Sequence, residues 1–84
     1  MSEASKASEV TLYWRPGCPF CTRLTAAMQA EGIEYRPVDI WEDDDAAAFV
    51  RSIANGNETV PTVTVGDISM VNPPVERILE ALRA

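Results

Sequence analysis

The stretch that decides the fold is Cys18-Pro19-Phe20-Cys21. Two cysteines three positions apart at the start of a helix lie about one turn apart on one face, so they can close a small ring. The unpaired N–H groups of the first helical turn and the positive end of the helix dipole favour a thiolate on the first sulfur. Pro19 fits the first helical position, because the donor that a proline lacks has no partner there. The motif therefore predicts a nucleophilic thiol, Cys18, with a resolving thiol, Cys21, behind it.

The segments around this motif predict a strand, a helix and a second strand. Residues 10–14, Val-Thr-Leu-Tyr-Trp, are rich in β-branched and aromatic side chains, which is typical of a buried strand. Apolar residues recur at helical spacing from Phe20 to Glu31, and Gly32 is a suitable residue to end that helix. A second strand is expected within residues 33–40. Two strands that are joined by one helix over so short a distance form a parallel pair.

The next segment predicts a second helix and then a hairpin. The acidic run Glu42-Asp43-Asp44-Asp45 caps this helix and complements its dipole, and Asn55-Gly56-Asn57 ends it. The stretch from Val60 to Val65 is typical of a strand that begins at a proline. Gly66-Asp67 is a hairpin signal, so residues 68–71 are expected to return antiparallel to the preceding strand.

The end of the chain predicts a third helix. Asn72 is the expected N-cap, with Pro73 in the first helical position. The predicted order is βαβαββα, which is an α/β fold with a four-stranded mixed sheet flanked by three helices. We expect one domain over residues 9–84, preceded by a disordered tail over residues 1–8.

Composition excludes several classes of function. The chain has 84 residues and a net charge of -6, which argues against a general affinity for nucleic acid. It has no histidine, so a histidine base, a cysteine–histidine pair and a histidine metal site are excluded. The first residues are polar and small, and no run is apolar and long enough for a signal peptide or a membrane span. We therefore expect a cytoplasmic protein, in which a lone Cys-x-x-Cys motif indicates redox or metal chemistry rather than a structural disulfide.

Three motifs together resemble the glutaredoxin family of the thioredoxin fold. They are the Cys-Pro-Phe-Cys stretch after the first strand, Thr59-Val60-Pro61 before the third strand, and Val71-Asn72-Pro73 before the last helix. The resemblance runs from about Val10 to the end of the chain. Within the family, the stretch Asn55 to Val63, Asn-Gly-Asn-Glu-Thr-Val-Pro-Thr-Val, is similar to the corresponding stretch of the actinobacterial mycoredoxins.

The resemblance implies a thiol–disulfide oxidoreductase in which Cys18 attacks the substrate disulfide and Cys21 resolves the mixed disulfide. It also implies a cis peptide bond between Val60 and Pro61. Such a bond would present the backbone N–H and C=O groups of Val60 to an extended substrate.

Four further residues are candidates for substrate binding. Arg15 lies three residues before Cys18, where glutaredoxins commonly carry a lysine, so it could favour the thiolate or hold a polar group of the substrate. Phe20 is expected to form a partly exposed wall of the substrate groove. Asn72, beyond its capping role, and Thr59 are candidates for hydrogen bonds to a low-molecular-weight thiol.

The two tryptophans are expected to be structural. Trp14 lies at the end of the first strand, which favours a core position over one at the rim of the site. Trp41 follows the second predicted strand and is expected to cover the end of that strand.

The resemblance also indicates the substrate. Glutathione-using glutaredoxins carry a Gly-Gly pair and an acidic residue near the start of the last helix, whereas this chain has Val71-Asn72 and then Pro73-Pro74-Val75. This departure argues against glutathione. We expect a monomer that has no bound cofactor and reduces mixed disulfides on protein cysteines, with mycothiol as the reducing co-substrate.

Three alternatives remain open at this stage. One is a dithiol electron donor that is fed by thioredoxin reductase and serves ribonucleotide reductase or a peroxidase, which would need Cys21 for every substrate. Another is a metal or iron–sulfur carrier, although two cysteines are too few for a four-coordinate site within one chain, so no metal ligand is assigned. The third is a binding module whose cysteine pair has no catalytic role.

Overall fold

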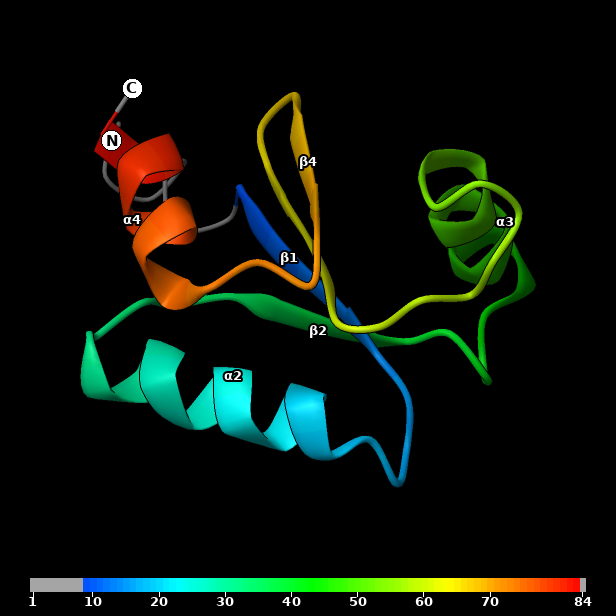
Figure 1. Ribbon diagram of the computed structural model, residues 1–84, viewed down its shortest axis with the longest axis horizontal. Helices are drawn as coiled ribbons and strands as arrows, with labels where there is room; N and C mark the ends of the chain where they lie inside the picture. Colours follow the sequence, from blue (N-terminus) through cyan, green and yellow to red (C-terminus); the bar gives the residue numbers. More distant parts are fainter. Residues whose placement is uncertain (1–8, 84) are drawn as a thin grey trace.

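The computed structural model describes residues 9–83 of the chain, and the predicted tail, residues 1–8, lies outside the described residues. The described part contains the predicted elements in the predicted order (Figure 1). They are β1 (Val10–Trp14), α2 (Pro19–Ala30), β2 (Arg36–Asp39), α3 (Asp44–Ile53), β3 (Thr62–Val65), β4 (Ile68–Val71) and α4 (Val75–Arg83).

The four strands form one mixed sheet in the order β2-β1-β3-β4. The β1 and β2 strands are parallel, with Trp14 opposite Asp39, which confirms the predicted parallel pair. The β3 strand is antiparallel to β1 on its other side and to β4, so the predicted hairpin is also confirmed. The prediction of an α/β fold with a mixed sheet and three helices is therefore correct.

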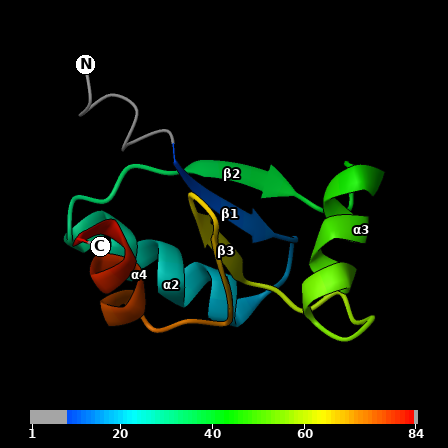
Figure 2. The ribbon, with the colours of Figure 1, turned by 90° about the horizontal axis from the view of Figure 1, so that it is seen from above.

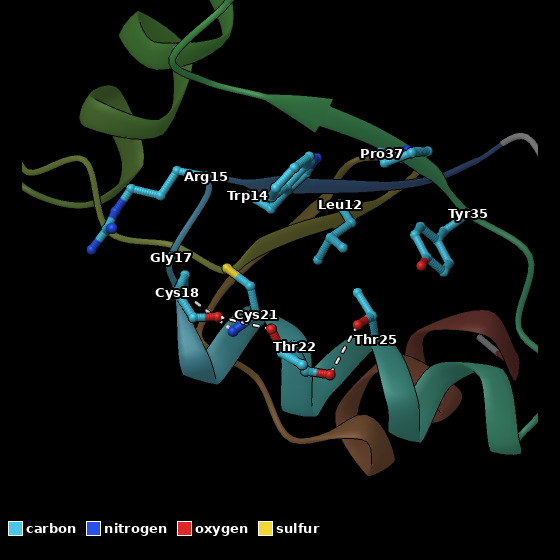
Figure 3. A pocket seen from close by; sticks show the side chains of 10 residues that line it. All are labelled: Leu12, Trp14, Arg15, Gly17, Cys18, Cys21, Thr22, Thr25, Tyr35 and Pro37. Atoms are coloured by element: carbon cyan, nitrogen blue, oxygen red, sulfur yellow. Dashed lines mark hydrogen bonds between the residues drawn. The ribbon is translucent and has the colours of Figure 1, made fainter.

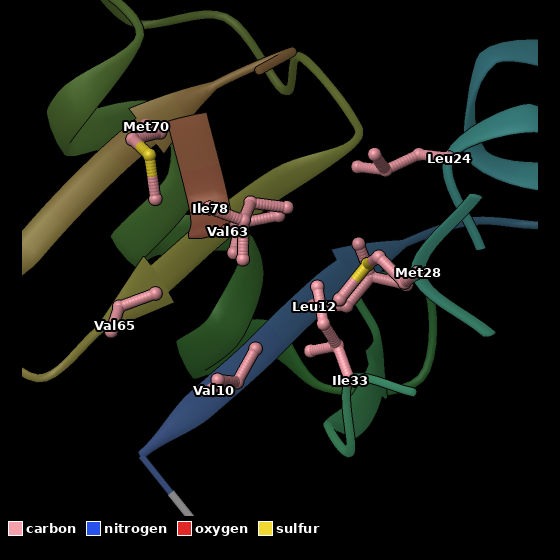
Figure 4. Packing of buried hydrophobic residues seen from close by; sticks show 9 residues of the cluster. All are labelled: Val10, Leu12, Leu24, Met28, Ile33, Val63, Val65, Met70 and Ile78. Carbon is pink, nitrogen blue, oxygen red and sulfur yellow. The ribbon is translucent and has the colours of Figure 1, made fainter. Parts of the chain in front are cut away.

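Side chains that alternate along β1 separate the two faces of the sheet. Leu12 belongs to the main core with Leu24 and Met28 of α2 and Ile78 of α4, so these two helices cover one face (Figure 4). Tyr13 points to the other face, where its ring centre lies 5.2 Å from that of Phe49 in α3. Figure 2 shows α3 set apart from α2 and α4, in agreement with these contacts.

The first turn of α2 brings the cysteine motif to one end of the sheet. Cys18 is the N-cap residue of α2, with extended backbone angles, and Pro19 occupies the first helical turn as predicted. A proline is tolerated there because it removes no intrahelical hydrogen bond. Gly17, just before the cap, has a φ of +75°, a backbone conformation that favours glycine. The motif thus begins at the carboxyl end of β1, within a tight turn.

Two predicted boundaries are wrong, and prolines explain both. The β3 strand begins at Thr62 rather than Val60, because Pro61 has no N–H group to donate to the ladder. The α4 helix begins at Val75, and Asn72 is not its N-cap. Asn72 has a φ of +49° and donates its backbone N–H to the Pro61 carbonyl at 2.7 Å. Pro73 cannot enter the helix, because the residue before a proline is disfavoured in the helical region and Pro74 follows it.

Candidate active site

Both cysteines are free thiols and both are buried, with Cys18 6% and Cys21 4% exposed. The place of Cys18 nearest the helix end favours exposure of its sulfur, but the structure buries Cys18 almost as deeply as Cys21. The sulfur atoms lie in a second apolar cluster, which includes Val60 and, from α3, Ala46 and Val50. These residues come from distant parts of the sequence and meet only in the folded protein.

The Cys18 sulfur is held by two backbone groups. The N–H of Cys21 donates to Cys18 Sγ at 3.1 Å, which is the capping bond of α2. The Cys18 thiol in turn donates to the carbonyl oxygen of Val60 at 3.8 Å. A helix N-terminal N–H that points at a sulfur stabilises negative charge on it, so this geometry suits a nucleophile.

The Cys21 thiol lies in a different environment. Burial, together with the neighbouring Cys18 sulfur, raises the pKa of Cys21 to about 12 from its ordinary value of 9.0. The backbone N–H and the positive charge of Arg15 oppose this rise without overcoming it. Cys21 therefore keeps its proton at neutral pH, which favours Cys18 over Cys21 as an attacking thiol.

A cavity of about 290 Å³ opens beside the two cysteines (Figure 3). It lies between the first turns of α2 and the strands β1 and β2. Its lining combines aromatic surface with hydroxyl groups and one guanidinium group. The lining residues are Leu12, Trp14, Arg15, Gly17, Cys18, Cys21, Thr22, Thr25, Tyr35 and Pro37.

The predicted substrate-binding residues fall into separate groups. Arg15 lines the same cavity as the cysteines. Phe20, 54% exposed as expected, and Asn72 line a second cavity of about 190 Å³ with the Arg23 side chain, whose guanidinium lies 5.6 Å from the Phe20 ring centre. The structure therefore places Phe20 and Asn72 around a different hollow from Arg15.

The segment before β3 forms a third group. The Val60–Pro61 peptide bond is cis, as the resemblance implied. The Val60 carbonyl faces the Cys18 sulfur, and Val60 is 9% exposed. Thr59 contributes its own carbonyl, which accepts a hydrogen bond from the hydroxyl of Thr62 at 2.8 Å. Of these three candidates, Val60 is the one in contact with a cysteine sulfur.

Several lining residues were missed in the sequence. Thr22 lies four residues after Cys18, and Thr25 lies four residues after Cys21, so the helical periodicity that placed the cysteines on one face could have found both. Tyr35, just before β2, carries no such signal, because only the fold brings it to the same cavity as α2.

The two tryptophans differ in burial. Trp14 is partly buried, packs against both apolar clusters and lines the cavity, so it is both core and rim. Trp41 is 60% exposed, so the expectation that it covers the end of the second strand is wrong. The guanidinium of Arg15 lies 5.6 Å from its ring centre. The loop after β2 turns Trp41 outward over this arginine.

Two other properties concern only residues 9–83. Within that range, no cluster of three or more cysteine or carboxylate side chains is arranged to hold a metal ion. None of the helices described there combines the length and apolar character needed to cross a membrane.

Comparison with known proteins defines the class. A model of the glutaredoxin family matches residues 10–69, and the chain belongs to this family. The crystal structure of a glutaredoxin from Archaeoglobus fulgidus superimposes with a TM-score of 0.74 at 28% identity, covering 92% of this chain and 88% of that one. The fold is therefore thioredoxin-like, and the protein is a glutaredoxin-like thiol–disulfide oxidoreductase.

Two relatives narrow the comparison. A protein assigned as a glutaredoxin in Mycobacterium tuberculosis is 41% identical over 70 residues, which is 82% of this chain and 83% of the relative. Mycoredoxin 1 of Corynebacterium glutamicum is 33% identical over 78 residues, which is 92% of this chain and 96% of the relative. The similarity thus extends over nearly the whole length of these small proteins.

Proposed function

We propose that this protein reduces mixed disulfides between protein cysteines and a low-molecular-weight thiol, and that this thiol is mycothiol. The observation that carries the reduction chemistry is the Cys18 sulfur, which accepts the Cys21 N–H at the start of α2. The choice of mycothiol rests on the similarity to mycoredoxin 1.

The cavity beside the cysteines supports a thiol that is rich in hydroxyl groups. Thr22, Thr25 and Tyr35 each carry a hydroxyl into its lining, and Arg15 adds several N–H donors. The Thr22 and Thr25 hydroxyls donate to helix carbonyls, which leaves their oxygen lone pairs free to accept. The Trp14 ring adds an apolar wall. Such a lining suits a sugar-bearing thiol, which presents both hydroxyl groups and apolar ring faces.

The reaction then proceeds in two exchanges. The Cys18 thiolate attacks the mycothiol sulfur of the mixed disulfide, its S–S bond breaks, and the protein thiolate leaves and takes a proton from water. A second mycothiol thiolate attacks the mycothiol sulfur that is now bound to Cys18. This releases Cys18 as a thiolate and yields the disulfide of two mycothiol molecules, so the substrate gains two electrons and two mycothiol molecules lose one each.

Cys21 is dispensable in this sequence, because the second thiol molecule performs the release. Its high pKa fits that role, since a protonated thiol does not compete for the mixed disulfide. For a disulfide between two protein cysteines, Cys21 would be needed to displace the substrate from Cys18.

The test is reduction of a mycothiolated peptide by mycothiol, followed by mass spectrometry, with the glutathionylated peptide and glutathione in parallel. Wild type and Cys21→Ser are expected to turn over the mycothiol pair faster than the glutathione pair. Cys18→Ser is expected to be inactive with both, because it lacks the attacking sulfur.

Two results would contradict the proposal. Equal or faster turnover with glutathione would remove the assignment of mycothiol. No turnover with either thiol, together with activity that needs thioredoxin reductase and is lost in Cys21→Ser, would identify the protein as a dithiol electron donor instead.

A further inference from the structure

Trp41 lies two residues after the end of β2, and its large apolar side chain remains in solvent. It is 60% exposed, compared with 54% for Phe20 and 40% for Ile68. Exposed aromatic side chains contribute little to a core but are frequent in binding surfaces. The position of this ring is therefore informative about the site beside it.

The loop that carries Trp41 is fixed against the end of β1. The Asp39 carboxylate accepts the Trp41 backbone N–H at 2.9 Å, and Ile40 donates its N–H to the Trp14 carbonyl at 2.9 Å. Arg15 follows Trp14 just as Trp41 follows Ile40. The end of the parallel β1–β2 pair thus brings Arg15 and Trp41 side by side.

The Arg15 guanidinium lies over the Trp41 ring, 5.6 Å from its centre, which is a cation–π contact. Within residues 9–83 no carboxylate forms an ion pair with Arg15, in contrast to Arg51, which pairs with Glu58 at 2.6 Å. The Arg15 side chain donates a hydrogen bond to the neighbouring Pro16 carbonyl at 3.4 Å. The ring therefore restrains this cation without neutralising it.

The charge of Arg15 also reaches Cys21. Arg15 lines the cavity that contains Cys18 and Cys21. Burial raises the pKa of Cys21 to about 12, and the positive charge of Arg15 is among the effects that oppose that rise. A charge that acts on one sulfur of the pair acts also on an anion that approaches the other.

We infer that Trp41 is a positioning residue, whose ring holds the Arg15 side chain at the cavity that contains Cys18. There the fixed charge favours a negatively charged substrate over a neutral one of the same shape. The substrates favoured by this arrangement are disulfides that carry a carboxylate close to the reacting sulfur, such as those in acidic peptides. The inference concerns charge preference at Cys18, so it goes beyond the identity of the low-molecular-weight thiol.

The test compares two reagents of nearly equal shape, iodoacetate and iodoacetamide. In both reactions the Cys18 thiolate forms a C–S bond and iodide leaves, and peptide mass spectrometry gives the rate at Cys18. The quantity of interest is the iodoacetate rate divided by the iodoacetamide rate. In Arg15→Ala and Trp41→Ala we expect this ratio to fall about three- to tenfold, the scale of one nearby charge in a partly solvated site.

Further variants separate positioning from a general structural role. Trp41→Phe keeps an aromatic face, so its ratio is expected to stay near that of wild type. The double variant Arg15→Ala/Trp41→Ala is expected to show the ratio of Arg15→Ala alone, because Trp41 acts through Arg15. Ile68→Ala, an exposed apolar position on β4, is the control with an unchanged ratio.

Two outcomes would overturn the inference. One is a wild-type ratio in Trp41→Ala. The other is an equal change of both rates, because that would indicate a general disturbance of Cys18. No mycothiol is used, so a failed mycothiol assay and a failed positioning role are distinguishable.

Discussion

The buried Cys21 thiol differs from a free cysteine in its pKa. Its pKa is raised to about 12, so at pH 9 only about one molecule in a thousand carries a Cys21 thiolate. We predict that alkylation of Cys21 by iodoacetamide in the folded, reduced protein becomes about tenfold faster with each pH unit from 8 to 11. Peptide mass spectrometry after timed quenching measures this rate separately from that of Cys18.

The control for this prediction is the same protein in concentrated urea. Unfolding removes the burial and the neighbouring sulfur, so Cys21 should regain its ordinary pKa of 9.0. In urea its alkylation rate should therefore stop rising once the pH passes that value. A plateau near pH 9 in the folded protein would show that burial does not control Cys21.

The positions of both cysteines could be predicted from the sequence, but their surroundings could not. The spacing in Cys18-Pro19-Phe20-Cys21 defines a helix start by local rules. The Cys18 thiol contacts the Val60 carbonyl, which lies 42 residues away in the chain. Only the pairing of β3 with β1 brings these two residues together. Burial of Cys18 therefore had no local signal.

Among the elements, α3 depends most clearly on a single cap. Asp43 is its N-cap, and the Asp43 carboxylate accepts the Ala46 N–H at 3.1 Å. We predict that Asp43→Ala lowers the free energy of unfolding by about 1 kcal/mol, because an N–H group of the first turn loses its partner. Urea unfolding followed by circular dichroism measures the change.

Asp45→Ala is the matched control for this cap. Asp45 is an exposed residue in the first turn of the same helix, so it contributes mainly through the helix dipole. Its replacement should cost less than the loss of Asp43. Equal losses in the two variants would mean that charge, rather than the capping hydrogen bond, supports the start of α3.

The other elements show where local rules succeed and fail. Their order and pairing could be predicted, because apolar spacing and turn residues are local signals. The starts of β3 and α4 lie closer to the C-terminus than predicted. Pro61 has no N–H to donate to the β-ladder, and Pro74 disfavours a helical conformation at Pro73. Asn72 takes a left-handed conformation that a capping rule does not anticipate.

For the molecule as a whole, the cysteines and the main core belong to two different apolar clusters. The core between the sheet and the helices α2 and α4 contains Ile78, which is fully buried. The cysteines belong instead to the cluster that includes Val50 of α3, also fully buried. Stability and reactivity should therefore respond differently to small cavities made in the two clusters.

We predict that Ile78→Val lowers the free energy of unfolding by about 1 kcal/mol and leaves the iodoacetamide rate at Cys18 unchanged. Val50→Ala should also be destabilising, and it should in addition change the Cys18 rate, because it opens space in the cluster to which Cys18 belongs. Urea unfolding gives the stability, and alkylation at neutral pH gives the reactivity of the same samples. If Ile78→Val changed the Cys18 rate as much as Val50→Ala, the reactivity of Cys18 would depend on the packing of both clusters rather than on its own.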